Sequence, residues 1–247
     1  MKLVLFDVDG TLIDSQAIIH ESMRQTFLRF GRQEPDISET RSIIGLTLDR
    51  AIATILNQDI TEEILAMTAE YKSCYLELAN RKDMQSLPFA GIPEMIDRLA
   101  QRDDLMLGIV TGKSRRGVRK LLEQSQFQGR FVVSRCADDC PSKPHPAMVK
   151  ECCEEVGMSP FNTIVIGDTG FDMQMAGSAG AKSIGVTWGY HAEQRIVDGG
   201  AGYMVRSVPS LENMIFSIAG ITGDQEPVAK EPTAQFGDTS PWYMQYA

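Results

Sequence analysis

Near its N-terminus the chain reads Phe6-Asp7-Val8-Asp9-Gly10-Thr11-Leu12, directly after the short aliphatic run Lys2-Leu3-Val4-Leu5. Such a run predicts a buried parallel strand, so we expect Asp7 where that strand ends, and the ligands of open α/β sheets bind at the carboxyl ends of strands. Asp7 and Asp9 are close in the chain, and carboxylates this close repel one another unless a cation or a shared proton separates them. Taken alone, the stretch is more typical of a strand followed by an Asp-Gly turn. The rest of the chain has to distinguish a turn from a functional site.

The composition is that of an ordinary globular protein, with 43% hydrophobic and 23% charged residues among 247. This length allows one large domain or a core domain with a smaller companion. The formal net charge of -9 argues against nucleic acid or an anionic membrane as the main partner. No apolar run approaches the roughly twenty residues of a membrane span, and the first apolar run is too short for a signal-peptide core. The odd number of cysteines lacks the spacing of a disulfide framework, which predicts a cytoplasmic protein.

Between Ser15 and Met84 the apolar residues recur only at helical spacing. Asp14 and Ser15 are expected to cap the first helix of this segment. Further helices are expected over 48–56 and from Thr61 onward, where a hydroxyl and two acidic residues suit a helix N-terminus. The segment is therefore predicted to be a small helical domain inserted into the chain.

From Pro88 onward, helices alternate with short apolar runs, a pattern typical of βαβ units and of a parallel sheet covered on both faces. The strands expected here are 105–110, 131–133, 163–166, 183–186 and a weaker one at 203–205. The predicted fold class is α/β: a doubly wound parallel sheet with a Rossmann-like core and an inserted small α-helical cap domain. The predicted domains are a core (1–14 and 86–221), a cap (15–85) and a tail (222–247).

The tail is rich in Gly, Pro and acidic residues, which predicts an exposed segment. Its terminal aromatic residues, Trp242, Tyr243 and Tyr246, are unusual for such a segment. Docking of these aromatic residues onto this chain or a neighbour is the less favoured alternative.

Several of the expected strands deliver a reactive group just after their last apolar residue. Asp7 follows the first strand, Thr111-Gly112-Lys113-Ser114 follows the second, and Gly167-Asp168-Thr169-Gly170-Phe171-Asp172 follows a later one. Lys143 lies between the last two, shortly before a helix that Pro146 opens. Because the sheet is expected to be parallel, all of these groups should meet at one edge. Each alone has an ordinary explanation as a turn, a loop cation or a capping acid, but their joint order argues against coincidence.

The set and its order resemble the haloacid dehalogenase superfamily of phosphohydrolases, whose motifs read D-x-D-G-T, a strand-terminal Thr or Ser, a Lys before a helix, and G-D-x-x-x-D. The resemblance extends to about Ser217, and the helical insert looks like the cap that this superfamily carries between its first two motifs. Two further stretches, Ile44-Gly45-Leu46-Thr47-Leu48 and Gly185-Val186-Thr187-Trp188-Gly189-Tyr190, look most like the phosphoglycolate phosphatase branch.

The resemblance implies that Asp7 is the nucleophile that forms an aspartyl-phosphate and that Asp9 is the general acid and base. It also implies a Mg²⁺ cofactor, which prefers hard oxygen ligands and shields an anionic nucleophile from an anionic phosphate. The implied metal ligands are Asp7, the backbone carbonyl of Asp9, and Asp168. The implied phosphate-binding residues are Thr111, Gly112 and Lys143. Asp172 is expected to orient Lys143 or a metal-bound water.

The implied substrate is a small phosphorylated metabolite, with phosphoglycolate as the first candidate. In the cap, the resemblance implies that Gly45, Leu46 and Arg50 face the leaving group. One alternative is a phosphosugar mutase of the same superfamily, which needs a second phosphate site, although the cap shows no basic cluster beyond Arg41 and Arg50. The other is a catalytically silent phosphate-binding regulatory protein. The sequence predicts no particular oligomeric state.

Three cations follow Thr111, namely Lys113, Arg115 and Arg116. They are candidates for attracting an anionic substrate. The pattern is nevertheless more typical of an ordinary solvated helix start that Ser114 caps.

Overall fold

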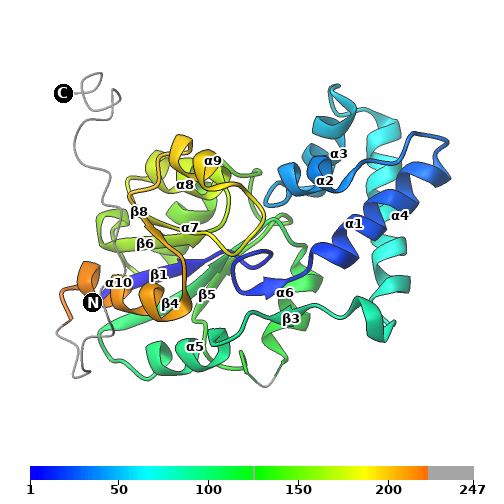
Figure 1. The fold of residues 1–247 in the computed structure, drawn as a ribbon. Coiled ribbons are helices and arrows are strands. Elements are labelled where there is room, and N and C mark those ends of the chain that lie inside the picture. Colours follow the sequence, from blue (N-terminus) through cyan, green and yellow to red (C-terminus); the bar gives the residue numbers. More distant parts are fainter. Residues whose placement is uncertain (125, 222–247) are drawn as a thin grey trace.

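The computed structural model describes residues 1–124 and 126–221 (Figure 1). At the centre is a six-stranded sheet in the order β5-β4-β1-β6-β7-β8, and every neighbouring pair of strands is parallel. Its strands are β1 (Lys2–Phe6), β4 (Leu105–Val110), β5 (Val133–Arg135), β6 (Thr163–Gly167), β7 (Lys182–Val186) and β8 (Tyr203–Val205). The predicted parallel sheet is thus confirmed. The strand expected over 131–133 is displaced to Val133–Arg135, and Phe131, which precedes it, packs its ring edge-on against Phe6.

Helices cover both faces of the sheet, as the doubly wound class requires. They are α5 (Ile92–Ala100), α6 (Arg115–Leu122), α7 (Ala147–Glu155), α8 (Gly170–Ala179), α9 (Glu193–Asp198) and α10 (Val208–Ala219), with a short 3₁₀ helix, η2 (Pro160–Asn162). Alternate residues of β1 point to opposite faces. Val4 and Phe6 join the apolar cluster under α5 and α10, while Leu3 and Leu5 join the cluster under α7 and α8. The central strand is therefore buried on both sides.

The helical insert contains α1 (Gln16–Arg29), α2 (Ile37–Ile43), α3 (Leu48–Leu56), α4 (Glu62–Leu78) and the 3₁₀ helix η1 (Lys82–Met84). These helices have an apolar cluster of their own, which includes Met23, Phe27 and Met67, and they lie together at one end of the molecule (Figure 1). Helix α2 was not expected from the sequence. The capping box formed by Asp36 and Glu39 is the local signal that marks its start.

A two-stranded antiparallel ribbon joins the insert to the core. Strand β2 (Ile13–Asp14) pairs with β3 (Leu87–Pro88), so the chain leaves and re-enters the core at neighbouring positions. The predicted capping role of Ser15 is wrong, because its side chain makes no capping hydrogen bond although it occupies the N-cap position of α1. Asp14 Oδ1 accepts the Gln16 N–H instead, at 3.3 Å.

In residues 1–124 and 126–221, no helix has the length and apolar character needed to span a bilayer. All five cysteines are buried and carry free thiols. The predicted tail, with its terminal aromatic residues, lies outside the described residues.

Candidate active site

The turn after β1 is shaped by its contact with Asp168. Gly10 has φ +82°, and a Cβ at this position would lie 2.2 Å from Asp168 Oδ2, so only glycine fits. Thr11 Oγ1 donates a hydrogen bond of 2.9 Å to Asp168 Oδ1. The D-x-D-G-T stretch is thus a tight turn and also part of a site, since its Gly and Thr hold a carboxylate that comes from a distant strand.

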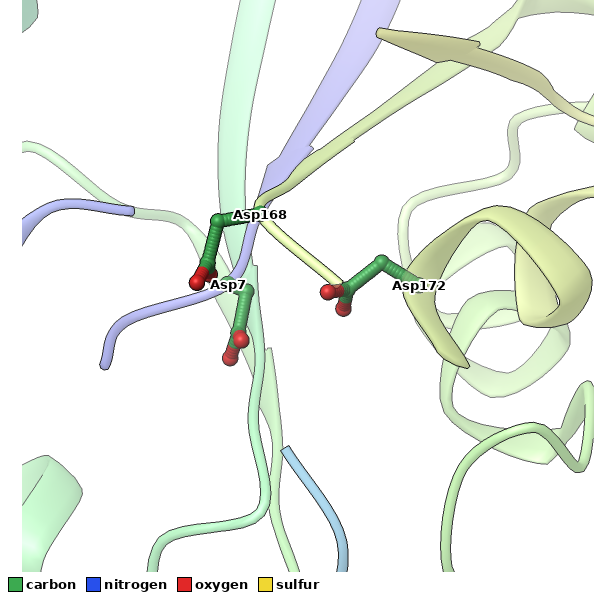
Figure 2. A group of neighbouring side chains, drawn as sticks. All are labelled: Asp7, Asp168 and Asp172. Carbon is green, nitrogen blue, oxygen red and sulfur yellow. The ribbon is translucent and has the colours of Figure 1, made fainter. Parts of the chain in front are cut away.

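Three buried carboxylates converge at the carboxyl edge of the sheet. Asp7 follows β1 and Asp168 follows β6, two adjacent strands, while Asp172 comes from the first turn of α8 (Figure 2). One oxygen of each of the three carboxylates lies within 4.8 Å of the others. The topology predicted from the sequence therefore brings these three residues together.

Lys143 bridges two of the carboxylates. Its Nζ donates a hydrogen bond of 2.6 Å to Asp172 Oδ1 and lies 2.9 Å from Asp7 Oδ1 in an ion pair, with all three side chains buried. Burial by itself lowers the pKa of Lys143, but the charges of Asp172 and Asp7 outweigh it and raise the pKa above its usual value. Asp172 Oδ2 also accepts the Thr169 Oγ1 proton at 2.6 Å, so Asp172 is fully engaged in orienting Lys143 and capping α8.

The two remaining carboxylates suit a divalent cation. Both oxygens of Asp7 are buried, and apart from the Lys143 ammonium, 2.9 Å from Oδ1, no donor among the described residues bonds to them. Burial is the main cause that raises the pKa of Asp7, to about 7, and Asp172 adds to it while Lys143 opposes it. Burial, with the charges of Asp7 and Asp172, also raises the pKa of Asp168 well above its usual value. Mg²⁺ prefers carboxylate oxygens, and oxygens of the buried Asp7 and Asp168 lie within 4.8 Å of one another, so these residues fit the implied cofactor.

Asp9 turns away from this cluster. Its Oδ1 accepts a hydrogen bond from Ser15 Oγ. The same oxygen forms an ion pair with Lys113 Nζ at 2.6 Å. The interpretation of Lys113 as a solvated helix start is therefore wrong: its side chain is only 14% exposed and lies before α6, with its Nζ 5.8 Å from the Tyr75 ring centroid. The neighbouring basic residues in the sequence give no signal for this contact, since the partner, Asp9, lies in the loop after a different strand.

The other two cations of this group behave as expected. Arg115 contacts Asp139 and Ser134, away from the carboxylate cluster, and Arg116 is exposed. Ser114 caps α6, since its side chain accepts the Gly117 N–H.

Thr111 and Gly112 lie under a loop of the insert. Thr111 is fully buried, and its Oγ1 accepts the Lys113 N–H at 3.2 Å. A Cβ on Gly112 would lie 2.5 Å from the Leu46 carbonyl oxygen and 2.8 Å from that of Gly45. Gly45 and Leu46 are thus in contact with the predicted phosphate-binding loop, and their predicted position facing the leaving group stays a prediction.

One more contact defines how the insert meets the core. The Thr47 N–H donates to Ser142 Oγ at 2.9 Å, one residue before Lys143. Arg50, in contrast, is exposed on α3, and in the described part of the chain its guanidinium makes no contact with the predicted site residues. The insert loop 44–47 therefore covers the carboxyl edge of the sheet, while the predicted role of Arg50 gains no support.

Comparison with known proteins agrees with this geometry. Residues 4–186 match the family model described as haloacid dehalogenase-like hydrolase. A protein of Dickeya dadantii named "Probable phosphatase IndB" is 30% identical over 78% of this chain and 84% of its own length. A phosphoglycolate phosphatase of Pseudomonas putida is 26% identical over 77% of this chain and 71% of its own length. The crystal structure of a predicted phosphatase from Clostridium acetobutylicum superposes with a TM-score of 0.75 at 25% identity, covering 87% of this chain and 98% of that one.

Proposed function

The chain belongs to the haloacid dehalogenase-like hydrolases, and we propose that it hydrolyses a small phosphate monoester through an aspartyl-phosphate formed on Asp7. The observation that carries this proposal is the state of Asp7, a buried carboxylate whose close polar partner among the described residues is the Lys143 ammonium, 2.9 Å from its Oδ1. It lies beside Lys143 and Asp168 at the edge where substrates of such sheets bind. An unsolvated carboxylate beside a fixed cation is suited to attack a phosphorus atom.

In the first step, an Asp7 oxygen attacks phosphorus while the bond from phosphorus to the leaving oxygen breaks. Lys143 balances negative charge on Asp7 and on the transferring phosphoryl group. Thr111 and the backbone N–H groups that follow it donate hydrogen bonds to the phosphoryl oxygens. Asp9 protonates the leaving alkoxide and, in the second step, accepts a proton from the water that attacks the aspartyl-phosphate. Alcohol and inorganic phosphate are the products.

We assign the Mg²⁺ ligands to Asp7, the backbone carbonyl of Asp9, and Asp168. Asp172, although near them, is occupied by Lys143 and Thr169. When bound, the ion neutralises negative charge on the nucleophile and the phosphate, which lets one anion approach another. Thr11 and the backbone of Tyr190 hold the Asp168 carboxylate in place for this purpose.

The substrate proposed first is phosphoglycolate. The similarity to a phosphoglycolate phosphatase of Pseudomonas putida supports it, and so does the contact of Gly45 and Leu46 with the Gly112 loop, which favours a small leaving group. The free, buried cysteines support a cytoplasmic location.

A phosphate-release assay over a panel of small phosphate esters, with and without Mg²⁺, tests this proposal. We expect release that depends on Mg²⁺ and is abolished in Asp7→Asn, while the exposed Asp59→Asn control behaves as wild type. Asp9→Asn should lose about 10²- to 10⁴-fold of the activity. The absence of release over the whole panel, or full activity in Asp7→Asn, contradicts the proposal and favours the silent regulatory protein. Conversion of a sugar phosphate to its isomer that depends on a sugar bisphosphate and gives no net phosphate release favours the phosphosugar mutase.

A further inference from the structure

In the segment that follows β7, Trp188, Gly189 and Tyr190 each contact a residue of the candidate site. Trp188 Nε1 donates a hydrogen bond of 3.1 Å to the carbonyl oxygen of Thr11. A Cβ on Gly189 would lie 2.2 Å from the Asp168 Cβ, so the backbone can pass there only because the residue is glycine. The Tyr190 N–H donates a hydrogen bond of 2.8 Å to Asp168 Oδ2. The backbone of Tyr190 is thereby fixed to one of the three central carboxylates.

The side chain of Tyr190 reaches from this point to the junction between core and insert. Its hydroxyl oxygen accepts the Ser15 N–H at 2.8 Å, and its proton is donated to Asp14 Oδ1 at 3.2 Å. The ring packs against the apolar cluster of the insert. Tyr190 therefore contacts the core through its backbone and the first residues of the insert through its side chain.

Ser15 is the next link. It occupies the N-cap position of α1, where a serine normally turns its oxygen toward the backbone N–H groups of the first helical turn. Here the side chain makes no such bond and donates its proton to Asp9 Oδ1. The second donor to that oxygen is the Lys113 ammonium. The serine hydroxyl therefore has two competing positions, one on the helix and one on the proposed acid and base.

We propose that Tyr190 is a positioning residue that holds Ser15 against Asp9 and so keeps the proton-transferring carboxylate aligned with the leaving group. This inference rests on the proposed function. Without the Tyr190 hydroxyl, the Ser15 N–H and the Asp14 carboxylate lose a partner, and the Ser15 hydroxyl is free to turn and cap α1. Among the described residues, Asp9 Oδ1 then retains the Lys113 ammonium, whose three equivalent N–H donors do not fix the orientation of the carboxylate.

The test compares two substrates of similar size that differ in their need for an acid. Benzyl phosphate releases a poor alkoxide that must be protonated, whereas p-nitrophenyl phosphate releases a stable phenolate. The quantity measured is kcat/KM, since it reports only the steps up to phosphoryl transfer to Asp7 and not the later hydrolysis. The variants are Tyr190→Phe, which keeps the ring and removes the hydroxyl, and Ser15→Ala, which removes the hydroxyl that bonds to Asp9. Tyr203→Phe, in the edge strand β8, is the matched control.

For Tyr190→Phe and Ser15→Ala we expect kcat/KM for benzyl phosphate to fall about 10- to 100-fold, a part of the contribution of a general acid. We expect kcat/KM for p-nitrophenyl phosphate to stay within about 3-fold of wild type, and Asp9→Asn to show the same selectivity in stronger form. Tyr203→Phe should match wild type on both substrates.

An equal loss on both substrates in the two variants, or no loss on either, overturns the positioning role of Tyr190. Melting temperatures measured alongside identify a variant that has lost its fold, and the second variant then decides the question. Failure of the proposed function has a different signature, because wild type would then hydrolyse neither ester or Asp7→Asn would hydrolyse both.

Discussion

Nζ of Lys143 lies 2.6 Å from Oδ1 of Asp172, and neither side chain is exposed to solvent. Together with its ion pair to Asp7, this contact places one ammonium among three buried carboxylates. The cation is therefore required by the fold as well as by the proposed chemistry, because buried charges are stable only when they are paired.

The Lys143→Met variant should show how far the stability of the fold depends on this cation. Removing one partner of a buried ion pair leaves uncompensated charge, so we expect the metal-free protein to lose about 3 kcal/mol of unfolding free energy at pH 8. Part of the loss should return at pH 5, where Asp7 and Asp168, whose pKa values are raised by burial, take up protons. Urea denaturation at the two pH values measures both effects, and the exposed Lys120→Met serves as control. An unchanged unfolding free energy at pH 8 contradicts the assignment of Lys143 as the cation of this cluster.

The close approach of Gly112 to the insert predicts that a side chain at this position displaces the loop 44–47. In Gly112→Ala the new methyl group meets the Leu46 and Gly45 carbonyl oxygens, which belong to the backbone and cannot turn aside. We expect the loop 44–47 to be displaced, with kcat/KM lowered about 10- to 100-fold by the misplaced site. Hydrogen exchange of residues 44–47 should become faster. The Gly177→Ala control adds its methyl group where nothing lies within 4 Å, and normal exchange of the loop in Gly112→Ala would show that the close approach is not maintained in solution.

His191 predicts a pH dependence of stability. Burial lowers its pKa to about 4, with a further contribution from Arg195, while its Nδ1 accepts the Gly170 N–H at 3.2 Å. The folded pKa lies below the usual 6.5, so the folded state favours the neutral ring and loses stability as the pH falls from about 6.5 to about 4. At pH 5 the penalty is on the order of 2 kcal/mol.

The comparison of wild type with His191→Gln isolates this penalty, since the amide does not titrate. We expect the difference in unfolding free energy between the two proteins to shift in favour of the variant as the pH is lowered from 7.5 to 5. The exposed His145→Gln is the control and should show no such shift. A difference that stays constant with pH would mean that the ring is already charged in the folded protein at pH 5.

Addition of Mg²⁺ should stabilise the protein in a pH-dependent way. Because the pKa of Asp7 is raised to about 7, from 3.8, the metal-free protein loses stability as the pH rises through this interval. A metal ion needs the ionised carboxylate, so its stabilising effect grows over the same interval. We expect the melting temperature to rise more on addition of Mg²⁺ at pH 8 than at pH 5, and Asp7→Asn to remove most of that rise. Equal shifts at both pH values would argue against Asp7 as a ligand.

The sheet and the positions of its reactive groups were predictable because both depend on local pattern. Short aliphatic runs mark the strands, and Asp7, Thr111 and Asp168 follow directly after three of them. The parallel topology then requires these residues to meet, and the contact of Lys143 with Asp172 completes the predicted set.

The partners of Asp9 were not predictable, because a local explanation competed with the tertiary one. Ser15 has the sequence position of a helix cap, and Lys113 that of a cation before a helix, yet both side chains turn to the same carboxylate. Tyr190 carries no local signal of its position, since its contacts with Ser15 and Asp168 join residues far apart in the chain. Such contacts follow from the packing of the insert against the core, which no local pattern encodes.

The antiparallel ribbon of β2 and β3 has a consequence for how this architecture can change. Asp14 and Leu87 stand opposite one another, so the core needs only a short turn between them to be a continuous chain. Everything from Ser15 to Ser86 can therefore be lengthened, shortened or exchanged without altering the order of the six strands or the positions of Asp7 and Asp168. The ribbon is thus the point at which a different insert could be joined to the same six-stranded core.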